Sequence, residues 1–294
     1  MKKYLLVIAL LFIIPFPVKA QSISIAVIGD SLSHEYRAVP RGNSTSYNWV
    51  EILGRIRGVN FGTLTNNNYA YDYAWSGNTV SGQMAGMVTK ALSDSTNRVI
   101  ILLGYNDIAG GANVTSTINT YSLQVDRLLT KYASGDILAV SIPQADCGDN
   151  NANINSFNSQ LQALATNKGI HFAGSLCPLL NAYAINANEY NYGGQIVNRW
   201  SWCHVNCLKL PNDGHPGTIA QAMIANTVTS FLGVSNVTEA EVLALMGIGS
   251  VPTSTPTRTA TPAPTFTPTP IILSCPVGYH WIGIDARSVQ CVGD

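Results

Sequence analysis

Charge is scarce in this sequence, and it is not clustered. Charged residues make up 11% of the chain, and 16 Lys and Arg residues balance 16 Asp and Glu residues. Binding to nucleic acid or to an anionic membrane relies on clustered cations. The composition therefore argues against both kinds of partner, and it leaves Asn, Ser, Thr, Gln and Tyr to cover most of the surface.

Long apolar runs are also missing, except at the amino terminus. Lys2 and Lys3 precede an apolar stretch at residues 5–16, and Ala20 ends a small-residue cleavage site. The stretch is shorter than the about 20 residues that a membrane-spanning helix needs. This pattern is typical of a secretory signal peptide, here residues 1–20. We therefore expect a secreted protein whose mature chain begins near Gln21 and contains no transmembrane segment.

The chain contains six cysteines, an even number in a protein that is expected to leave the reducing cytosol. Disulfides are the usual state of such cysteines. We expect the pairs Cys147 with Cys177, Cys203 with Cys207, and Cys275 with Cys291. The first pair is favoured because both residues follow a predicted strand at the same end of the sheet. The alternative is a metal site of Cys203, His204, Cys207 and His215, which export disfavours, so we expect no metal and no cofactor.

Residues 22–247 alternate between short apolar runs and segments of helical period. The predicted strands are residues 23–28, 98–103, 136–142 and 169–173, with 69–74 as a weaker candidate. The predicted helices are residues 48–57, 83–92, 114–128, 154–166, 218–231 and 237–247. Asn113 is expected to cap the helix that begins at residue 114. This order predicts an α/β fold, a three-layer α/β/α sandwich with a parallel sheet of about five strands, whose functional loops gather at the carboxyl ends of the strands.

The composition changes abruptly to Thr and Pro at residues 251–270. A segment with so few apolar residues cannot bury a core, so we expect an extended linker that follows a domain of residues 21–250. Residues 271–294 are too few to fold on hydrophobic burial alone, and a disulfide would supply the missing constraint. This small module is either a stapled hairpin without a ligand or a tail that binds a surface or a glycan through Tyr279, His280 and Trp281.

A serine stands where the first predicted strand ends. The segment Gly29-Asp30-Ser31-Leu32-Ser33 follows residues 23–28 directly. Gly29 permits an unusual turn, and a helix that starts after it would present the Ser31 Oγ and the Ser31 backbone N–H to one reacting carbonyl. Taken alone, such a motif is more often an ordinary turn.

Two further loops follow predicted strands. In Trp75-Ser76-Gly77-Asn78-Thr79, Gly77 lets a backbone N–H approach a ligand without an intervening side chain. In Gly104-Tyr105-Asn106-Asp107, Asn106 follows the buried strand at residues 98–103 and would point its amide at the same crevice. Each loop is also consistent with a purely structural turn.

A histidine precedes the helix predicted at residues 218–231. His215 lies in the segment Asn212-Asp213-Gly214-His215-Pro216. Near pH 7 an imidazole can take a proton from a serine hydroxyl, and a neighbouring carboxylate fixes its tautomer and stabilises the cation. The chain has no Gly-x-Ser-x-Gly motif, which counts against the α/β-hydrolase family.

Read together, the four segments resemble the GDSL, or SGNH, hydrolase family over residues 22–233. The resemblance implies the flavodoxin-like SGNH hydrolase fold, with Ser31 as nucleophile and His215 as general base. It also implies an oxyanion hole formed by the N–H groups of Ser31 and Gly77 and by the side chain of Asn106.

One position departs from the family pattern. The acid of the family usually sits three residues before the histidine, where this chain has Asn212. The nearby carboxylate, Asp213, sits two residues before it. Either Asp213 orients His215, which we favour, or the site is a dyad in which Asn212 or a carbonyl holds the ring. Asp30 suits the role less, because its part in the family is structural.

The resemblance implies a secreted serine esterase or lipase that hydrolyses carboxylic esters through an acyl-Ser31 intermediate. A polar, uncharged surface and the Thr/Pro linker favour an acylated polysaccharide as substrate, for instance one that is deacetylated. A small ester or a lipid ester is the alternative substrate. The alternative to an enzyme is a catalytically degenerate binding protein of the same fold, which the imperfect acid position supports.

Overall fold

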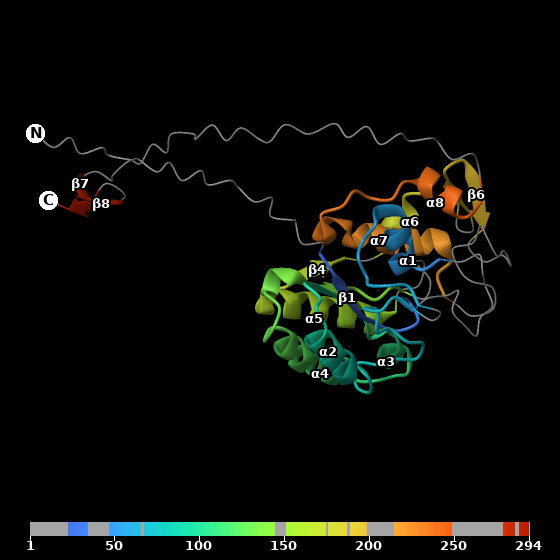
Figure 1. The fold of residues 1–294 in the computed structure, drawn as a ribbon, viewed down its shortest axis with the longest axis horizontal. Helices are drawn as coiled ribbons and strands as arrows, with labels where there is room; N and C mark the ends of the chain where they lie inside the picture. The colour runs from blue at the N-terminus through green and yellow to red at the C-terminus, as the bar shows by residue number, and fades with distance from the viewer. Residues whose placement is uncertain are drawn as a thin grey trace, which may run out of the picture. The chain divides into compact units, whose positions relative to one another are not determined.

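A computed structural model shows how these segments fold (Figure 1). It describes residues 23–34, 47–65, 68–144, 151–174, 176–186, 189–198, 215–248, 279–285 and 288–293. The chain divides into two units, Met1–Pro252 and Thr253–Asp294. The larger unit contains the segments that the sequence analysis singled out for chemistry.

Four parallel strands form the centre of the larger unit. They are β1 (Ile25–Gly29), β2 (Arg98–Leu102), β3 (Ile137–Val140) and β4 (His171–Ala173), in the order β1-β2-β3-β4. Val27 lies opposite Ile100, and Ile100 lies opposite Leu138. β1 and β3 are buried along their whole length, as is typical of parallel sheets that are covered on both faces. The predicted α/β fold with a parallel sheet is confirmed.

The weaker strand candidate at residues 69–74 contributes one bridge to the sheet. The Val27 N–H donates to the Tyr71 carbonyl oxygen, and the Tyr73 N–H donates to the Val27 carbonyl oxygen, each over 2.9 Å. Asp72 therefore pairs in parallel with Val27, on the edge of β1 that β2 leaves open. The described sheet has four full strands, this bridge and a second parallel bridge between Ser24 and Asn60, where the sequence predicted about five strands.

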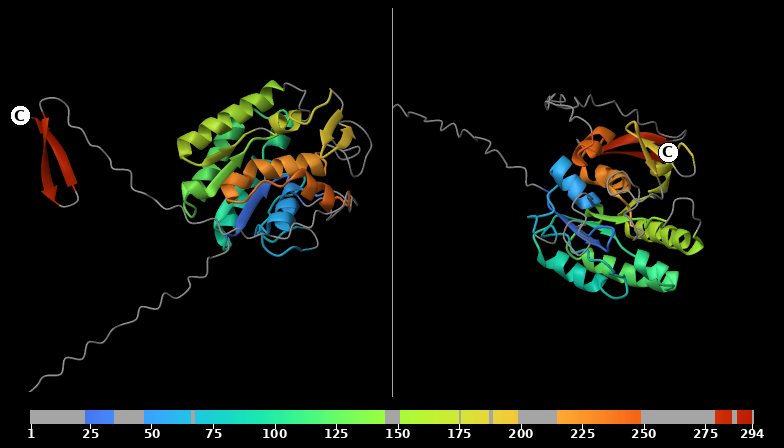
Figure 2. Two further views of the ribbon diagram at one scale, coloured as in Figure 1. Left: turned by 90° about the horizontal axis from the view of Figure 1, so that it is seen from above. Right: turned by 90° about the vertical axis from the view of Figure 1, so that its right-hand side faces the viewer.

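Helices cover both faces of the sheet (Figures 1 and 2). On one face α1 (Trp49–Arg57) packs against α7 (Thr218–Leu232), next to α6 (Cys177–Asn181) and α8 (Glu239–Leu245). On the other face lie α2 (Met84–Ser93), α3 (Tyr105–Ala109), α4 (Val114–Leu128) and α5 (Ala152–Lys168). A short 3-10 helix, η1 (Ser134–Asp136), leads into β3. The predicted three-layer arrangement is confirmed.

Asparagine side chains cap three of these helices at their amino ends. Asn48 Oδ1 accepts from the Glu51 N–H over 2.8 Å at α1. Asn113 Oδ1 accepts from the Ser116 N–H over 3.0 Å at α4, as the sequence predicted, and Asn151 caps α5 in the same way. Such a cap contributes about 1 kcal/mol to stability. Of the three caps, the sequence predicted Asn113, whereas α5 begins at Ala152, ahead of the predicted start at residue 154.

Two antiparallel hairpins lie outside the main sheet. In the larger unit β5 (Glu189–Tyr192) pairs with β6 (Gln195–Asn198), a hairpin that the sequence analysis did not anticipate. In the smaller unit β7 (Tyr279–Asp285) pairs with β8 (Ser288–Gly293), and Trp281 lies opposite Cys291.

Several predictions concern residues outside the described part of the chain. These are the signal peptide, the linker at residues 251–270, and Cys147, Cys203, Cys207, Cys275, Asn212 and Asp213. The cysteine pairings therefore stay predictions. None of the described helices combines the length and apolar character needed to cross a bilayer. Within the same residues, no group of three or more His, Cys, Asp or Glu side chains is placed to hold a metal ion.

Candidate active site

The chain turns tightly where β1 ends, and Ser31 lies in this turn. The Leu32 N–H donates to Asp30 Oδ1 over 2.9 Å. The N–H groups of Ser33 and His34 both donate to the Asp30 carbonyl oxygen, over 3.1 and 3.0 Å. A helical turn therefore begins directly at the end of the strand, and it leaves 7% of the Ser31 surface exposed.

Gly29 is required at the start of this turn for reasons of space. A Cβ atom on Gly29 would lie 2.7 Å from Ser33 Oγ and 3.1 Å from the Leu102 carbonyl oxygen. These separations are too short for a carbon atom, so a side chain would displace the turn. Gly29 is not among the glycines with a positive φ. Its role is therefore to let β2 and the Ser31 turn approach closely, and not to supply the unusual backbone angle that the sequence analysis expected.

Two helices hold the Ser31 turn from one side. The Trp49 Nε1–H of α1 donates to Ser33 Oγ over 3.0 Å. Gln221 of α7 donates through Nε2 to the Leu32 carbonyl oxygen over 3.1 Å, and its Oε1 accepts from the Trp49 N–H over 3.0 Å. All these groups are buried, so they restrain the turn that carries Ser31. The sequence analysis missed Gln221, because a polar residue inside a helix carries no motif.

The loop of residues 75–81, which carries Gly77, is fixed to the end of β1. Asn78 Nδ2 donates to the Gly29 carbonyl oxygen over 3.0 Å and lies 3.3 Å from Met87 Sδ. Gly77 is exposed and has a φ of 85°, which favours glycine. A Cβ atom at this position would meet no other atom within 4 Å. The Gly77 backbone is therefore open to a ligand beside the Ser31 turn.

Asn106 and Asp107 join the loop after β2 to the 75–81 loop. Asn106 Nδ2 donates to the Asn78 carbonyl oxygen over 2.9 Å. The buried Asp107 carboxylate accepts from the Val80 N–H over 2.8 Å. The sequence analysis did not assign Asp107 this role, because Asn-Asp after a strand also reads as an ordinary helix start.

Asp30 is fully buried next to Ser31 and is close enough to His215 for their charges to interact. Burial raises the pKa of the Asp30 carboxyl to about 7, against the lowering effects of the Leu32 N–H and the His215 charge. Asp30 Oδ2 accepts no hydrogen bond from any described residue. His215 is half-buried and lies just before α7. His215 therefore lies near Asp30, just before the amino end of α7.

The structure brings the four described candidates to one edge of the sheet, where the carboxyl ends of β1 and β2 lie: Ser31, Gly77, Asn106 and His215. Their catalytic roles stay predictions. A hydroxyl, an imidazole and three N–H donors in this arrangement can attack and stabilise an acyl group. The favoured acid Asp213 and the alternative Asn212 lie outside the described residues.

A comparison with known families matches residues 27–205, more than half of the chain, to the GDSL-like lipase/acylhydrolase family. The matched range ends before His215, so the place of this residue in the site comes from the structure. No curated protein sequence matches the chain.

Solved structures with the same fold include three enzymes or lipolytic proteins from bacteria and from an environmental sample. A lipolytic protein of the G-D-S-L family from Veillonella parvula is 21% identical in sequence to this chain. The match covers 71% of this chain and 97% of that protein, with a TM-score of 0.46. A catalytic mutant of an acetylxylan esterase from Geobacillus stearothermophilus is 14% identical, with coverages of 73% and 96% and a TM-score of 0.50. An α/β-hydrolase enzyme from the metagenome of Lake Arreo in Spain is 14% identical, with coverages of 73% and 97% and a TM-score of 0.50. At 14% identity, the two matches with a TM-score of 0.50 show the fold alone.

Proposed function

Because the chain belongs to the GDSL-like lipase/acylhydrolase family, we propose that it is a serine esterase in which Ser31 is the nucleophile and His215 the general base. The observation that carries this proposal is the meeting of three loops at one edge of the sheet. Asn78 ties the 75–81 loop to the end of β1, Asn106 ties the loop after β2 to Asn78, and the His215 charge reaches Asp30 beside Ser31.

In the first half of the reaction Ser31 Oγ attacks the ester carbonyl carbon while His215 takes the hydroxyl proton. The tetrahedral intermediate then collapses, its bond to the alcohol oxygen breaks, and the alcohol leaves with the proton from His215. The acyl group remains bonded to Ser31 Oγ.

In the second half water attacks the acyl-Ser31 carbonyl carbon while His215 accepts a proton from the water. The bond to Ser31 Oγ breaks, the serine recovers its proton from His215, and a carboxylic acid is released. The net reaction consumes one ester and one water and yields one alcohol and one acid.

The oxyanion of both intermediates would be bound by the N–H groups of Ser31 and Gly77 and by Asn106. The Asn106 Nδ2 group carries two hydrogens, and one of them is used on the Asn78 carbonyl oxygen. This bond fixes the amide plane and leaves the second hydrogen for the oxyanion. Donors that are held in advance stabilise the developing charge without reorganising during the reaction.

The imidazole needs a partner that fixes its tautomer. We assign this role to Asp213, with a dyad supported by Asn212 or a carbonyl as the alternative. Asp30 contributes through its charge, since the attraction between Asp30 and His215 stabilises the imidazolium whenever Asp30 is ionised.

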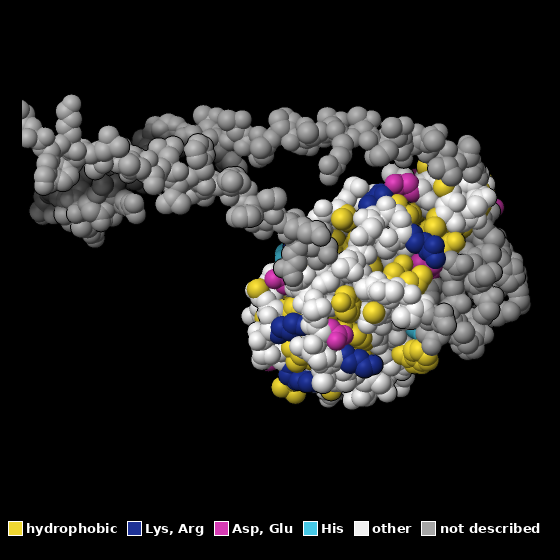
Figure 3. All heavy atoms as spheres, viewed as in Figure 1, with side chains coloured by type: hydrophobic (Ala, Val, Ile, Leu, Met, Phe, Trp, Pro, Cys, Tyr) yellow, Lys and Arg dark blue, Asp and Glu magenta, His cyan; other side chains and the backbone are white. Residues whose placement is uncertain are grey.

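We further propose that the protein is secreted and that its ester substrates are acylated polysaccharides. The signal-peptide pattern supports secretion. Uncharged side chains dominate the face shown in Figure 3, where Lys and Arg lie among Asp and Glu and neither sign forms a large patch, which suits a neutral polymer. One fold neighbour, from Geobacillus stearothermophilus, is an acetylxylan esterase. Amino-terminal sequencing of the exported protein would test secretion, and a start near Gln21 is the expected result.

A fluorophosphonate probe tests the nucleophile directly. It reacts with an activated serine hydroxyl, so mass spectrometry of the treated protein should locate the adduct on Ser31. Ser31→Ala is the matched control and should remain unlabelled at every serine. A wild-type protein that folds but takes up no probe would instead be a binding protein without esterase activity.

A further inference from the structure

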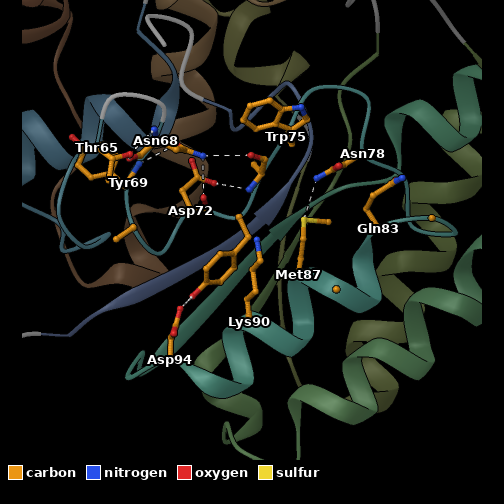
Figure 4. Close-up of a pocket in the computed structure, with 15 residues that line it drawn as sticks. Thr65, Asn68, Tyr69, Asp72, Trp75, Asn78, Gln83, Met87, Lys90 and Asp94 are labelled. Carbon is orange, nitrogen blue, oxygen red and sulfur yellow. Dashed lines mark hydrogen bonds between the residues drawn. The ribbon is translucent and has the colours of Figure 1, made fainter. Parts of the chain in front are cut away.

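A groove runs along α2 from the 75–81 loop. It has a volume of about 780 Å³, within the about 300–1,000 Å³ of typical ligand pockets. Trp75 and Asn78 lie at one end of it and Asp94 at the other, with Asp72 in between (Figure 4). Because Gly77 lies between Trp75 and Asn78, the groove begins next to the proposed oxyanion hole.

Trp75 gives this end of the groove a flat aromatic surface. The indole is 55% exposed, although its ring centroid lies 4.4 Å from that of the buried His34. An exposed tryptophan that is held by a neighbouring ring is already oriented, so a ligand that stacks on it loses little side-chain entropy.

Apolar atoms form more of the groove surface than polar atoms, but amide, ammonium and carboxyl groups also line it, and they carry little net charge. Gln83 Oε1 accepts from the Thr79 N–H over 2.8 Å, which fixes the amide, and no described residue accepts from its Nε2. Asp94 Oδ2 accepts from the Tyr73 hydroxyl over 2.5 Å, and the exposed Lys90 lies on the same side of the groove.

Asp72, between the two ends, is buried, and burial raises its pKa well above the ordinary value. Burial therefore disfavours the charged form of this carboxyl group. The positive charge of Lys90 and the negative charge of Asp94 then balance each other, so the groove attracts neither a polyanion nor a polycation.

These features of the groove favour a sugar chain over a fatty acyl chain as its ligand. An acyl chain would cover the polar groups of Gln83, Lys90 and Asp94 without offering them hydrogen bonds, which is costly. A sugar ring offers an apolar C–H face to an indole and hydroxyl groups that both donate and accept. The combination of one oriented aromatic face with amide, ammonium and carboxyl groups fits such a ligand.

We propose that this groove binds an uncharged glycan chain, which is the alcohol portion of the ester, with Trp75 stacking on a sugar ring next to the reacting acyl group. The inference rests on the proposed esterase function and names where its polymeric substrate lies.

Gly86 keeps the groove open. It lies in the first turn of α2, lines the groove, is exposed, and has open space where a Cβ atom would be. Glycine weakens a helix relative to alanine, so its presence here has no local structural advantage. A side chain at this position would enter the groove, and its Cβ atom would meet no other atom within 4 Å.

The test compares two substrates of the same enzyme. The ratio to measure is kcat/KM for acetylated xylo-oligosaccharides, or for acetylated glucomannan, divided by kcat/KM for p-nitrophenyl acetate. A ratio removes any effect that a substitution has on Ser31 chemistry itself. Trp75→Ala should lower the ratio about 10-fold or more, as loss of a central tryptophan contact does. Leu123→Ala, on α4 and 63% exposed, is the control and should keep the wild-type ratio.

Gly86→Phe provides a second, independent variant, because it blocks the groove without removing any contact. It should also lower the ratio about 10-fold or more. Its matched control is Gly135→Phe in η1, another exposed glycine whose Cβ would meet no atom within 4 Å. This control should keep the wild-type ratio.

An unchanged ratio in both Trp75→Ala and Gly86→Phe would overturn the glycan groove. A loss of kcat/KM confined to p-nitrophenyl decanoate would also overturn it, because the groove would then be an acyl-chain site. A wild-type enzyme that turns over no neutral acetylated glycan would overturn it as well. In all three cases fluorophosphonate labelling of Ser31 would continue if the proposed function is correct. Loss of that labelling in the wild-type protein identifies failure of the esterase proposal instead.

Discussion

Asn106 Nδ2 lies 2.9 Å from the carbonyl oxygen of Asn78, and this hydrogen bond joins the loop after β2 to the loop that carries Gly77. Asn78 in turn donates to the Gly29 carbonyl oxygen at the end of β1. Three segments that are distant in sequence thereby become one rigid edge beside Ser31.

Replacing Asn106 should affect catalysis much more than stability. Asn106→Ala removes an oxyanion donor, so kcat should fall by about 100-fold to 1,000-fold. The lost hydrogen bond should cost about 1 kcal/mol of unfolding free energy. Steady-state kinetics with p-nitrophenyl acetate and urea unfolding measure the two effects.

Asn113→Ala is the matched control for Asn106→Ala, because it removes an asparagine that only caps α4. It should cost about 1 kcal/mol of unfolding free energy and leave kcat unchanged. Equal kcat values for the two variants would show that Asn106 is a structural residue alone.

Adding one methyl group at Gly29 should disturb the nucleophile. In Gly29→Ala the new Cβ would lie 2.7 Å from Ser33 Oγ, so the turn must move. We expect a loss of about 1–3 kcal/mol in unfolding free energy, together with a lower kcat, because Ser31 shifts with the turn. Gly135→Ala, whose Cβ would meet open space, should show neither effect. Wild-type activity and stability in Gly29→Ala would contradict the close packing described for this turn.

Asp30 should make the fold less stable as the pH rises from about 4 to about 7. Burial raises the pKa of Asp30 in the folded chain to about 7, from an ordinary value of 3.8. Between these values the folded chain holds a proton that the unfolded chain has released, so the unfolding free energy falls with rising pH. Below this interval the full stability is present, and above it the loss is constant.

Asp30→Asn tests this linkage, because it keeps an acceptor for the Leu32 N–H but cannot titrate. Between pH 4 and pH 7 the unfolding free energy of Asp30→Asn should decline less than that of the wild type. The difference between the two declines should be at most about 4 kcal/mol. Urea unfolding at a series of pH values measures the difference. Parallel curves for the two proteins would mean that Asp30 does not hold a raised pKa.

Asp213→Asn should lower kcat on p-nitrophenyl acetate by about 100-fold or more, because the imidazole loses the carboxylate that orients it. His215→Ala should abolish turnover and is the reference for full loss. If Asp213→Asn keeps wild-type kcat while His215→Ala is inactive, the site is a dyad in which Asn212 or a carbonyl holds the ring.

Much of the fold was predictable because it depends on local patterns. The apolar runs at residues 98–103 and 136–142 contain β2 and β3, and Asn113 begins α4 where expected. The β5–β6 hairpin was missed although Gly193 and Gly194, both with positive φ, form a two-residue turn between its strands. A Gly-Gly pair between two short strands is by itself typical of a hairpin, but neither strand is a long apolar run.

The sequence by itself determined the order of the main-sheet strands and of the longer helices. It also determined the places where Ser31, Gly77, Asn106 and His215 follow or precede them, because periodicity and turn chemistry act over a few residues. The tertiary structure alone decided the Gln221 contact with Leu32 across 189 positions, the raised pKa of Asp30, and the groove beside Trp75. These properties arise from burial and from contacts between segments far apart in the chain, which no local pattern encodes.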